Sequence, residues 1–153
     1  MTISNGEIDN GHWNNSGDQL DYLRARGFVY VIYNTLNGMG YIGKKNFRIN
    51  GKRNKGQQSA WRSYTSSSIS VNEDIQNHGK KHFQFYILDQ YYTTGGLSWA
   101  ETWSQTVAEI PSNNHLWYNR FIDKCMWEVK EPPTEKHRRR LKKLIGGICC
   151  DIH

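Results

Sequence analysis

Two tyrosines and a run of cations are the residues of this sequence whose types and spacing could support chemistry. Tyr30 lies in the apolar segment 28–34 and Tyr41 in the segment 41–45, at the same phase of two short predicted strands. From Lys44 to Arg62 the chain carries seven Lys/Arg and no Asp/Glu. Paired phenols beside a cationic, glycine-containing loop suit the cleavage of a phosphodiester, because cations offset the charge that develops on the phosphate oxygens.

Three strands and several helices are predicted to position these residues. Asn37-Gly38 is a hairpin signal between the two strands, and alternation over 82–88 predicts a third strand. Helices are expected at 71–78, 97–110, 117–129 and 135–145, with Ser70, Ser98 and Thr134 as caps, and a short one at 18–26. This order predicts an α+β fold, a small and mostly antiparallel three-stranded sheet flanked by helices.

The 153 residues favour one domain, which the pattern divides into three parts. Residues 1–27 are expected to form a loosely docked arm with a short helix, 28–129 the domain proper, and 130–153 a basic C-terminal helix and tail. The net charge of +6 favours a polyanionic partner. Three cysteines without metal-ligand spacing predict no structural zinc and a reducing compartment, and no segment is apolar for long enough to span a membrane. A cytoplasmic location is therefore expected.

Several ordered blocks of the chain resemble the GIY-YIG nucleases, and in particular their phage-type or homing-like branch. Tyr41-Ile42-Gly43 matches the second half of the family motif, and Phe28-Val29-Tyr30 stands where the family has Gly-Ile-Tyr. The similarity continues through 60–68, 74–83, 97–101 and 117–119, and covers about residues 28–122. The resemblance implies a metal-dependent DNA endonuclease, with Mg²⁺ or Mn²⁺ as cofactor, double-stranded DNA as partner and a homodimer as one possible assembly.

Carried over residue by residue, the resemblance implies a catalytic set. Tyr30 would orient or deprotonate water, Tyr41 would support it, and Glu101 would hold the metal, with Glu109 and Glu128 as rivals. An arginine should stabilise the phosphate, and both Arg62 and Arg53 are candidates. The family's helix histidine has no equivalent here, and Tyr64 or a nearby lysine could replace it. Gly43 would allow close backbone packing, and Asn119 would hold the site together by hydrogen bonds.

The basic segments are expected to contact phosphates. The candidates for nucleic-acid binding are Lys44, Lys45, Lys52, Lys55, Arg138, Arg139 and Arg140. The alternative to an enzyme is a non-catalytic nucleic-acid-binding protein that has the same fold, and a third class is a basic structural or interaction protein. The first two are distinguished by whether the two tyrosines, an arginine and Glu101 converge on one phosphate-sized space.

Overall fold

The computed structural model describes residues 7–50, 53 and 55–150, with side chains as far as residue 147. Its strands are β1 (Gly27–Asn34), β2 (Gly40–Asn46) and β3 (Phe83–Tyr91). Its α-helices are α1 (Ile69–His78), α2 (Thr94–Val107) and α3 (Glu135–Cys150), joined by short 3-10 turns η1 (Trp61–Ser63), η2 (Lys80–His82) and η3 (Ile110–Ser112). The α+β prediction with three antiparallel strands is confirmed.

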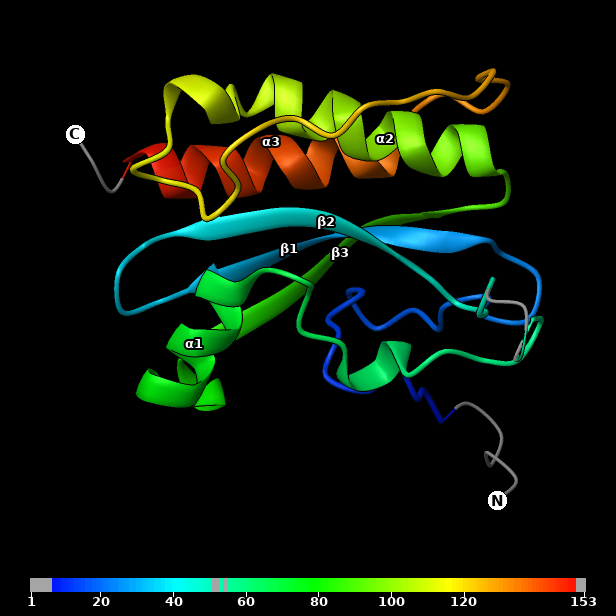
Figure 1. Cartoon of the computed structure of the whole chain (residues 1–153), viewed down its shortest axis with the longest axis horizontal. Coiled ribbons are helices and arrows are strands. Elements are labelled where there is room, and N and C mark those ends of the chain that lie inside the picture. Colours follow the sequence, from blue (N-terminus) through cyan, green and yellow to red (C-terminus); the bar gives the residue numbers. More distant parts are fainter. Residues whose placement is uncertain (1–6, 51–52, 54, 151–153) are drawn as a thin grey trace.

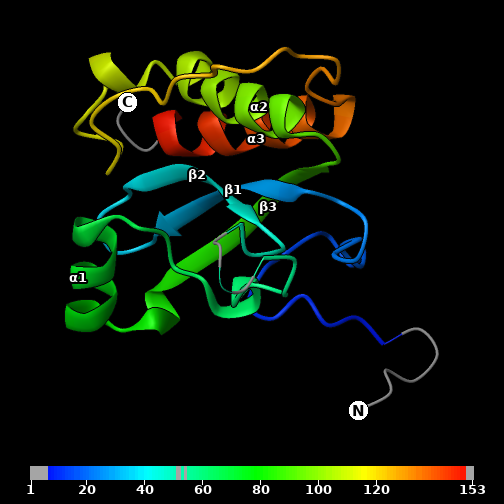
Figure 2. The ribbon, with the colours of Figure 1, turned by 45° about the vertical axis from the view of Figure 1, so that its right-hand side comes forward.

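The sheet lies between two layers, with strand order β2-β1-β3. Helices α2 and α3 lie side by side over one face, and α1 covers part of the other together with the N-terminal segment, residues 7–26 (Figure 1). Figure 2, turned by 45°, shows the same separation. Alternate residues of β1 therefore enter two cores, with Phe28, Tyr30 and Ile32 on the α1 side and Val29 and Val31 on the α2 side.

The N-terminal segment is part of the core, which corrects the expected loosely docked arm. Trp13 is 4% exposed and its indole N–H donates to the carbonyl of Trp61 at 2.6 Å, while Leu20 and Ala25 are also buried. Residues 18–26 form turns instead of the expected helix. The polar composition of this segment wrongly suggested a loose arm. Its polar side chains are satisfied within the segment, since Asn10 bonds Asp18, Gln19 and Leu20, and its few apolar side chains can therefore be buried.

A second correction concerns 117–129, where a helix was expected and the chain runs as an irregular loop. Here residues 117–119 attach to the edge of β2, since the amide of Tyr118 donates to the carbonyl of Gly40 at 2.7 Å. Backbone groups that pair with a strand cannot form helical bonds at the same time.

The helices also begin or end at other residues than predicted. Ser68, not Ser70, caps α1 by accepting from the amide of Val71, and Thr93, not Ser98, caps α2 by accepting from Gly96. Thr134 accepts from the amide of His137 at 3.1 Å as expected, but α3 continues through Gly146 and Gly147.

Helix α3 docks on the sheet through one buried histidine, a residue that sequence reasoning did not single out. His137 is 0% exposed, with Nε2 2.6 Å from the Ser104 hydroxyl and Nδ1 2.9 Å from the Tyr91 hydroxyl. The Ser104 hydroxyl donates to the Ala100 carbonyl, so Nε2–H must be the donor to Ser104 and Nδ1 must accept from Tyr91. The imidazole is therefore held neutral.

We expect His137 to make the fold acid-sensitive. Burial, helped by Arg138 and Arg140, lowers its pKa from 6.5 to about 3. The unfolded chain then binds a proton that the folded chain does not, so stability is full above pH 6.5 and declines as the pH falls toward 3, by about 3 kcal/mol at pH 4.5. Glu101, whose pKa burial raises to about 7, changes stability in the opposite sense over this range, so the loss is measured as the difference between the wild type and His137→Gln in urea unfolding at pH 7.5 and 4.5.

The variant His137→Gln should show a smaller loss of stability between these pH values than the wild type, whatever its stability at neutral pH. His115→Gln is the control, because this histidine is exposed and should leave the pH dependence unchanged. Equal pH slopes in wild type and His137→Gln would contradict the assignment. His12, whose pKa burial lowers to about 4, adds to the loss at low pH in both proteins.

Candidate active site

The two tyrosines predicted from the sequence lie together, on the α1 side of the sheet near the edge formed by β2. The rings of Tyr30 and Tyr41 are stacked with centroids 6.2 Å apart. Between them lies Gly43, paired with Tyr30 across the strands. A Cβ added to Gly43 would fall 2.5 Å from the Tyr30 hydroxyl and 2.9 Å from the Tyr41 ring, so the phenol crosses the strand where a side chain is missing.

Tyr64 completes a group of three phenols. Its ring stands edge-on to Tyr30 at 6.2 Å, and the ammonium of Lys45 lies 4.1 Å from its centroid. Burial raises the pKa of Tyr30 well above its ordinary value of 10, with Tyr41 and Tyr64 adding to the shift. Burial also raises the pKa of Tyr41 to about 12. Both phenols are therefore protonated at neutral pH and act as hydrogen-bonding groups.

The carboxylate of Glu101 reaches the same strand from α2. Its side chain is buried, and its Oε1 lies 3.9 Å from the Nζ of Lys44, which also donates to the Ser98 hydroxyl at 2.8 Å. Burial raises the Glu101 pKa to about 7, the neighbouring Asp123 adds to the rise, and Lys44 opposes it through its charge and its backbone N–H. Glu101 also contributes to the raised pKa of Tyr30 and Tyr41, which places it within electrostatic reach of both phenols.

Asn119 ties β2 into place at the residue between Tyr41 and Gly43. Its Oδ1 accepts from the Ile42 amide at 2.9 Å and its Nδ2 donates to the Ile42 carbonyl at 2.8 Å. Gln105 of α2 donates to the same carbonyl at 3.1 Å and to Asp123 at 2.9 Å. The side chain of Asn119 thus bonds β2 as a neighbouring strand would, and it fixes the position of the β2 backbone at Ile42.

Replacing Asn119 by Ala should therefore cost about 2 to 3 kcal/mol of unfolding free energy, because it leaves a buried N–H of Ile42 without a partner. Urea denaturation measures the loss. Asn113→Ala is a matched control, since its side chain bonds only one exposed carbonyl, that of Glu109. If the two variants were equally stable, Asn119 would not hold the strand.

A comparison with protein families identifies the family of the chain. A family model described as the putative endonuclease segE, GIY-YIG domain, matches residues 12–122. The chain belongs to this GIY-YIG family. The protein is thus placed in a nuclease family, whose substrate is nucleic acid. Neither the curated proteins nor the solved structures gave a match. The match in this GIY-YIG protein begins at His12, beside the Trp13 that packs 4.9 Å from the ring of Tyr30.

Of the two arginine candidates of this GIY-YIG domain, Arg62 is bound by residues other than Tyr30 and Tyr41, and Arg53 is exposed. The guanidinium of Arg62 is 3.2 Å from the carboxylate of Asp9, bonds Gln58 and stacks over Tyr22 and Trp61. Arg53 is exposed in the loop after β2. The cations that the structure brings to the phenols and Glu101 are Lys44 and Lys45.

A basic cavity extends from these lysines along the loop that follows β2. It has a volume of about 360 Å³. Arg48, which sequence reasoning did not single out, is held in its wall by the carbonyls of Tyr22 and Leu23 at 3.1 and 3.0 Å. The lining residues are Lys44, Lys45, Asn46, Arg48, Ile49, Asn50, Ser59 and Tyr64.

The remaining predicted residues lie elsewhere. Lys52 is outside the described residues, and Lys55 is exposed in the same loop as Arg53. Arg138 stacks over Trp103 at 4.7 Å, Arg139 is exposed on the outer face of α3, and Arg140 is half-buried against β3 at the far edge of the sheet. The rival carboxylates are exposed, Glu109 beyond the end of α2 and Glu128 in the loop before α3.

Besides Arg48 in the cavity wall, sequence reasoning missed Ser98 and Asp123, which lie beside Lys44 and Glu101. Ser98 lies one helical turn before Glu101, and that spacing could have indicated a shared face. Asp123 reaches the site only because the loop after Asn119 folds back over α2, and no local pattern indicates this.

Proposed function

We propose that this protein is a divalent-metal-dependent endonuclease that cleaves double-stranded DNA by attack of water on a phosphodiester. One observation carries the proposal, namely the convergence of two phenols, a buried carboxylate and two lysines at the β2 edge. Two phenols alone are common in strands. A buried carboxylate with a raised pKa beside them is typical of a functional site.

The donor set fits Mg²⁺ or Mn²⁺. Glu101 is a buried carboxylate whose nearest cation is 3.9 Å away, with the second carboxylate of Asp123 nearby, so a bound cation would relieve their repulsion. The described residues hold no cluster of three or more His, Cys, Asp or Glu side chains, and Mg²⁺ commonly uses one or two carboxylates, water and substrate phosphate. The ion would supply charge neutralisation at the phosphate and acidify bound water.

The chain's own residues supply positioning. Because the phenols of Tyr30 and Tyr41 are neutral, we assign them the orientation of the attacking water and of a phosphate oxygen by hydrogen bonds, and not proton removal. Lys44 and Lys45 offset charge on the phosphate, the task that the resemblance gives to an arginine. The basic cavity beyond them carries the neighbouring phosphates, which position the strand without reading its sequence. One such site makes one cut, so cleavage of both strands requires a homodimer or two binding events.

Arg62 favours a second candidate function, a non-catalytic nucleic-acid-binding protein. Its guanidinium is occupied by Asp9 and Gln58, so in this geometry Arg62 is not available to a phosphate at the phenols. The two functions differ in whether a phosphodiester is broken, and in whether the hydroxyl of Tyr30 matters.

Cleavage of supercoiled plasmid distinguishes them. With Mg²⁺ or Mn²⁺ the wild type should nick or linearise the plasmid, and EDTA should stop it. Tyr30→Phe removes one hydroxyl and should reduce the rate by about 100-fold or more. Tyr92→Phe is the control, because that phenol is 51% exposed and bonds Asp21. Salt-sensitive binding without any metal-dependent cutting, on plasmid and on genomic DNA, would favour the binding protein.

A further inference from the structure

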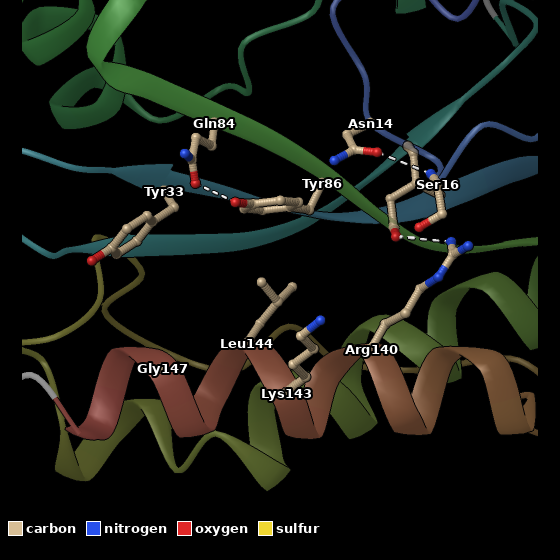
Figure 3. A pocket seen from close by; sticks show the side chains of 10 residues that line it. Asn14, Ser16, Tyr33, Gln84, Tyr86, Arg140, Lys143, Leu144 and Gly147 are labelled. Carbon is tan, nitrogen blue, oxygen red and sulfur yellow. Dashed lines mark hydrogen bonds between the residues drawn. The ribbon is translucent and has the colours of Figure 1, made fainter.

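A second cavity, of about 520 Å³, lies at the opposite edge of the sheet, between β3, α3 and the N-terminal segment (Figure 3). It is separate from the β2 edge, because β1 and β3 lie between. Its volume is in the range of small-molecule sites. The lining residues are Asn14, Ser16, Tyr33, Gln84, Tyr86, Ile87, Arg140, Lys143, Leu144 and Gly147.

One wall of this cavity is cationic. Arg140 is fixed in place, since its Nη1 donates to the Asn15 side chain at 2.7 Å and to the Ile87 carbonyl at 3.2 Å. Lys143 stands one turn further along α3 and extends into the same space in Figure 3. Among the described residues that line the cavity there is no Asp or Glu, so an anion of the size of a phosphate meets two positive charges and no opposing one.

The facing wall is aromatic and amide-bearing. In Figure 3 the Tyr86 ring is seen edge-on, with one face toward Leu144 of α3. The Gln84 side-chain oxygen accepts from the Tyr86 hydroxyl, and the Asn14 side-chain oxygen accepts from the Ser16 amide at 2.9 Å. With their oxygens so engaged, the amide nitrogens of Gln84 and Asn14 are the groups that can donate to a ligand.

The Asn14 donor is also fixed in position. The backbone of Asn14 pairs with β3 opposite Tyr86. Its amide donates to the carbonyl of Phe85 at 2.7 Å, and its carbonyl accepts from the amide of Ile87 at 2.9 Å. A flat ring with hydrogen-bond acceptors on its edge, joined to a phosphate, matches these two walls, since bases stack on aromatic faces and accept from amides.

We propose that this cavity binds one nucleotide, with the phosphate at Arg140 and Lys143 and the base against Tyr86. Two sources share this chemistry, a free mononucleotide and an unpaired nucleotide of a nucleic-acid strand. The site is distinct from the proposed cleavage site and does not depend on cleavage.

Isothermal titration of the full chain in EDTA, where cutting is suppressed, tests the proposal. The probes are deoxyadenosine 5′-monophosphate, inorganic phosphate and a short single-stranded oligothymidine. We expect saturable nucleotide binding that weakens about tenfold or more in Lys143→Gln, through the lost charge-assisted bond. Tyr86→Leu, which keeps apolar bulk but removes the ring, should weaken it similarly. Lys142→Gln is the matched control, because this neighbouring lysine is exposed outside the cavity.

The choice of probe distinguishes a free mononucleotide from an unpaired nucleotide of a strand. Binding of the mononucleotide supports a free ligand, and binding of the oligonucleotide alone, lost in Tyr86→Leu, supports an unpaired nucleotide of a strand. The proposal is overturned if neither probe binds to the folded protein, if Lys142→Gln and Lys143→Gln weaken binding equally, or if inorganic phosphate binds as tightly as the nucleotide. None of these results bears on plasmid cleavage, so the two proposals can fail separately.

Discussion

Replacing Glu101 by Gln should abolish metal-dependent cleavage while making the metal-free protein more stable. In the proposed site Glu101 is the buried carboxylate that holds the cation, and Gln has the same shape without the charge. We expect plasmid cleavage to fall by about 1000-fold or more, because charge stabilisation at the phosphate is the main catalytic contribution.

The stability change follows from the same carboxylate. Its folded pKa of about 7 lies above the ordinary 4.5, so the folded protein holds a proton that the unfolded chain has released, and stability declines as the pH rises from 4.5 through 7. Above pH 8 the charged carboxylate costs about 3 kcal/mol that Gln does not. The melting temperature of Glu101→Gln in EDTA should therefore exceed that of the wild type at pH 8 and equal it near pH 4.5.

Added Mg²⁺ or Mn²⁺ should raise the melting temperature of the wild type and leave that of Glu101→Gln unchanged, because a ligand stabilises only the state that binds it. Glu109→Gln is the control, since that carboxylate is exposed beyond the end of α2 and should change neither property. If Glu101→Gln were destabilised at pH 8, or still cut DNA at the wild-type rate, the assignment of Glu101 would be wrong.

Adding one methyl group at Gly43 should be nearly as damaging as removing Glu101. The new Cβ would fall 2.5 Å from the hydroxyl and 2.7 Å from Cζ of Tyr30, distances that require something to move. The Tyr30 ring is 1% exposed and packed against Trp13 and Phe28, so it cannot swing away. We expect Gly43→Ala to displace the phenol or β2 and to reduce cleavage by about 100-fold, the effect of a shift of about 1 Å in a positioned group.

Gly146→Ala provides the comparison for this variant. Gly146 lies in α3 with nothing within 4 Å of an added Cβ, and alanine favours a helix, so this change should leave cleavage intact and stability equal or higher. Rates are compared at saturating DNA with the fold checked by circular dichroism. A fully active Gly43→Ala would show that Tyr30 need not occupy the observed position.

The strands and the phenol pair were predictable because their signals are local. An apolar, β-branched run over 28–34, a hairpin turn at Asn37-Gly38 and a second tyrosine at the same phase indicate that both rings occupy one face. The role of Gly43 also follows locally, because a missing side chain between two tyrosines leaves room for one of them. Glu101 was predictable only from the family resemblance.

The rest of the site depends on contacts between distant parts of the chain. Arg62 is a plausible phosphate ligand in the sequence, and only the folded N-terminal segment brings Asp9 to it. The stretch 117–129 has enough apolar residues for a helix, but pairing of Tyr118 with Gly40 determines its conformation. Arg48 is likewise held by the carbonyls of Tyr22 and Leu23, and Asp123 by Gln105, which are long-range contacts that propensity does not encode.

The attachments at the two outer strands have a consequence for the pairing of the sheet with other chains. A sheet with open flanks offers unpaired amides and carbonyls to any other extended chain. Here Asn14 covers part of the β3 flank and the segment from Leu116 to Asn119 covers the start of the β2 flank. These two segments therefore also hinder intermolecular strand addition, and shortening either one would expose strand backbone groups to other chains.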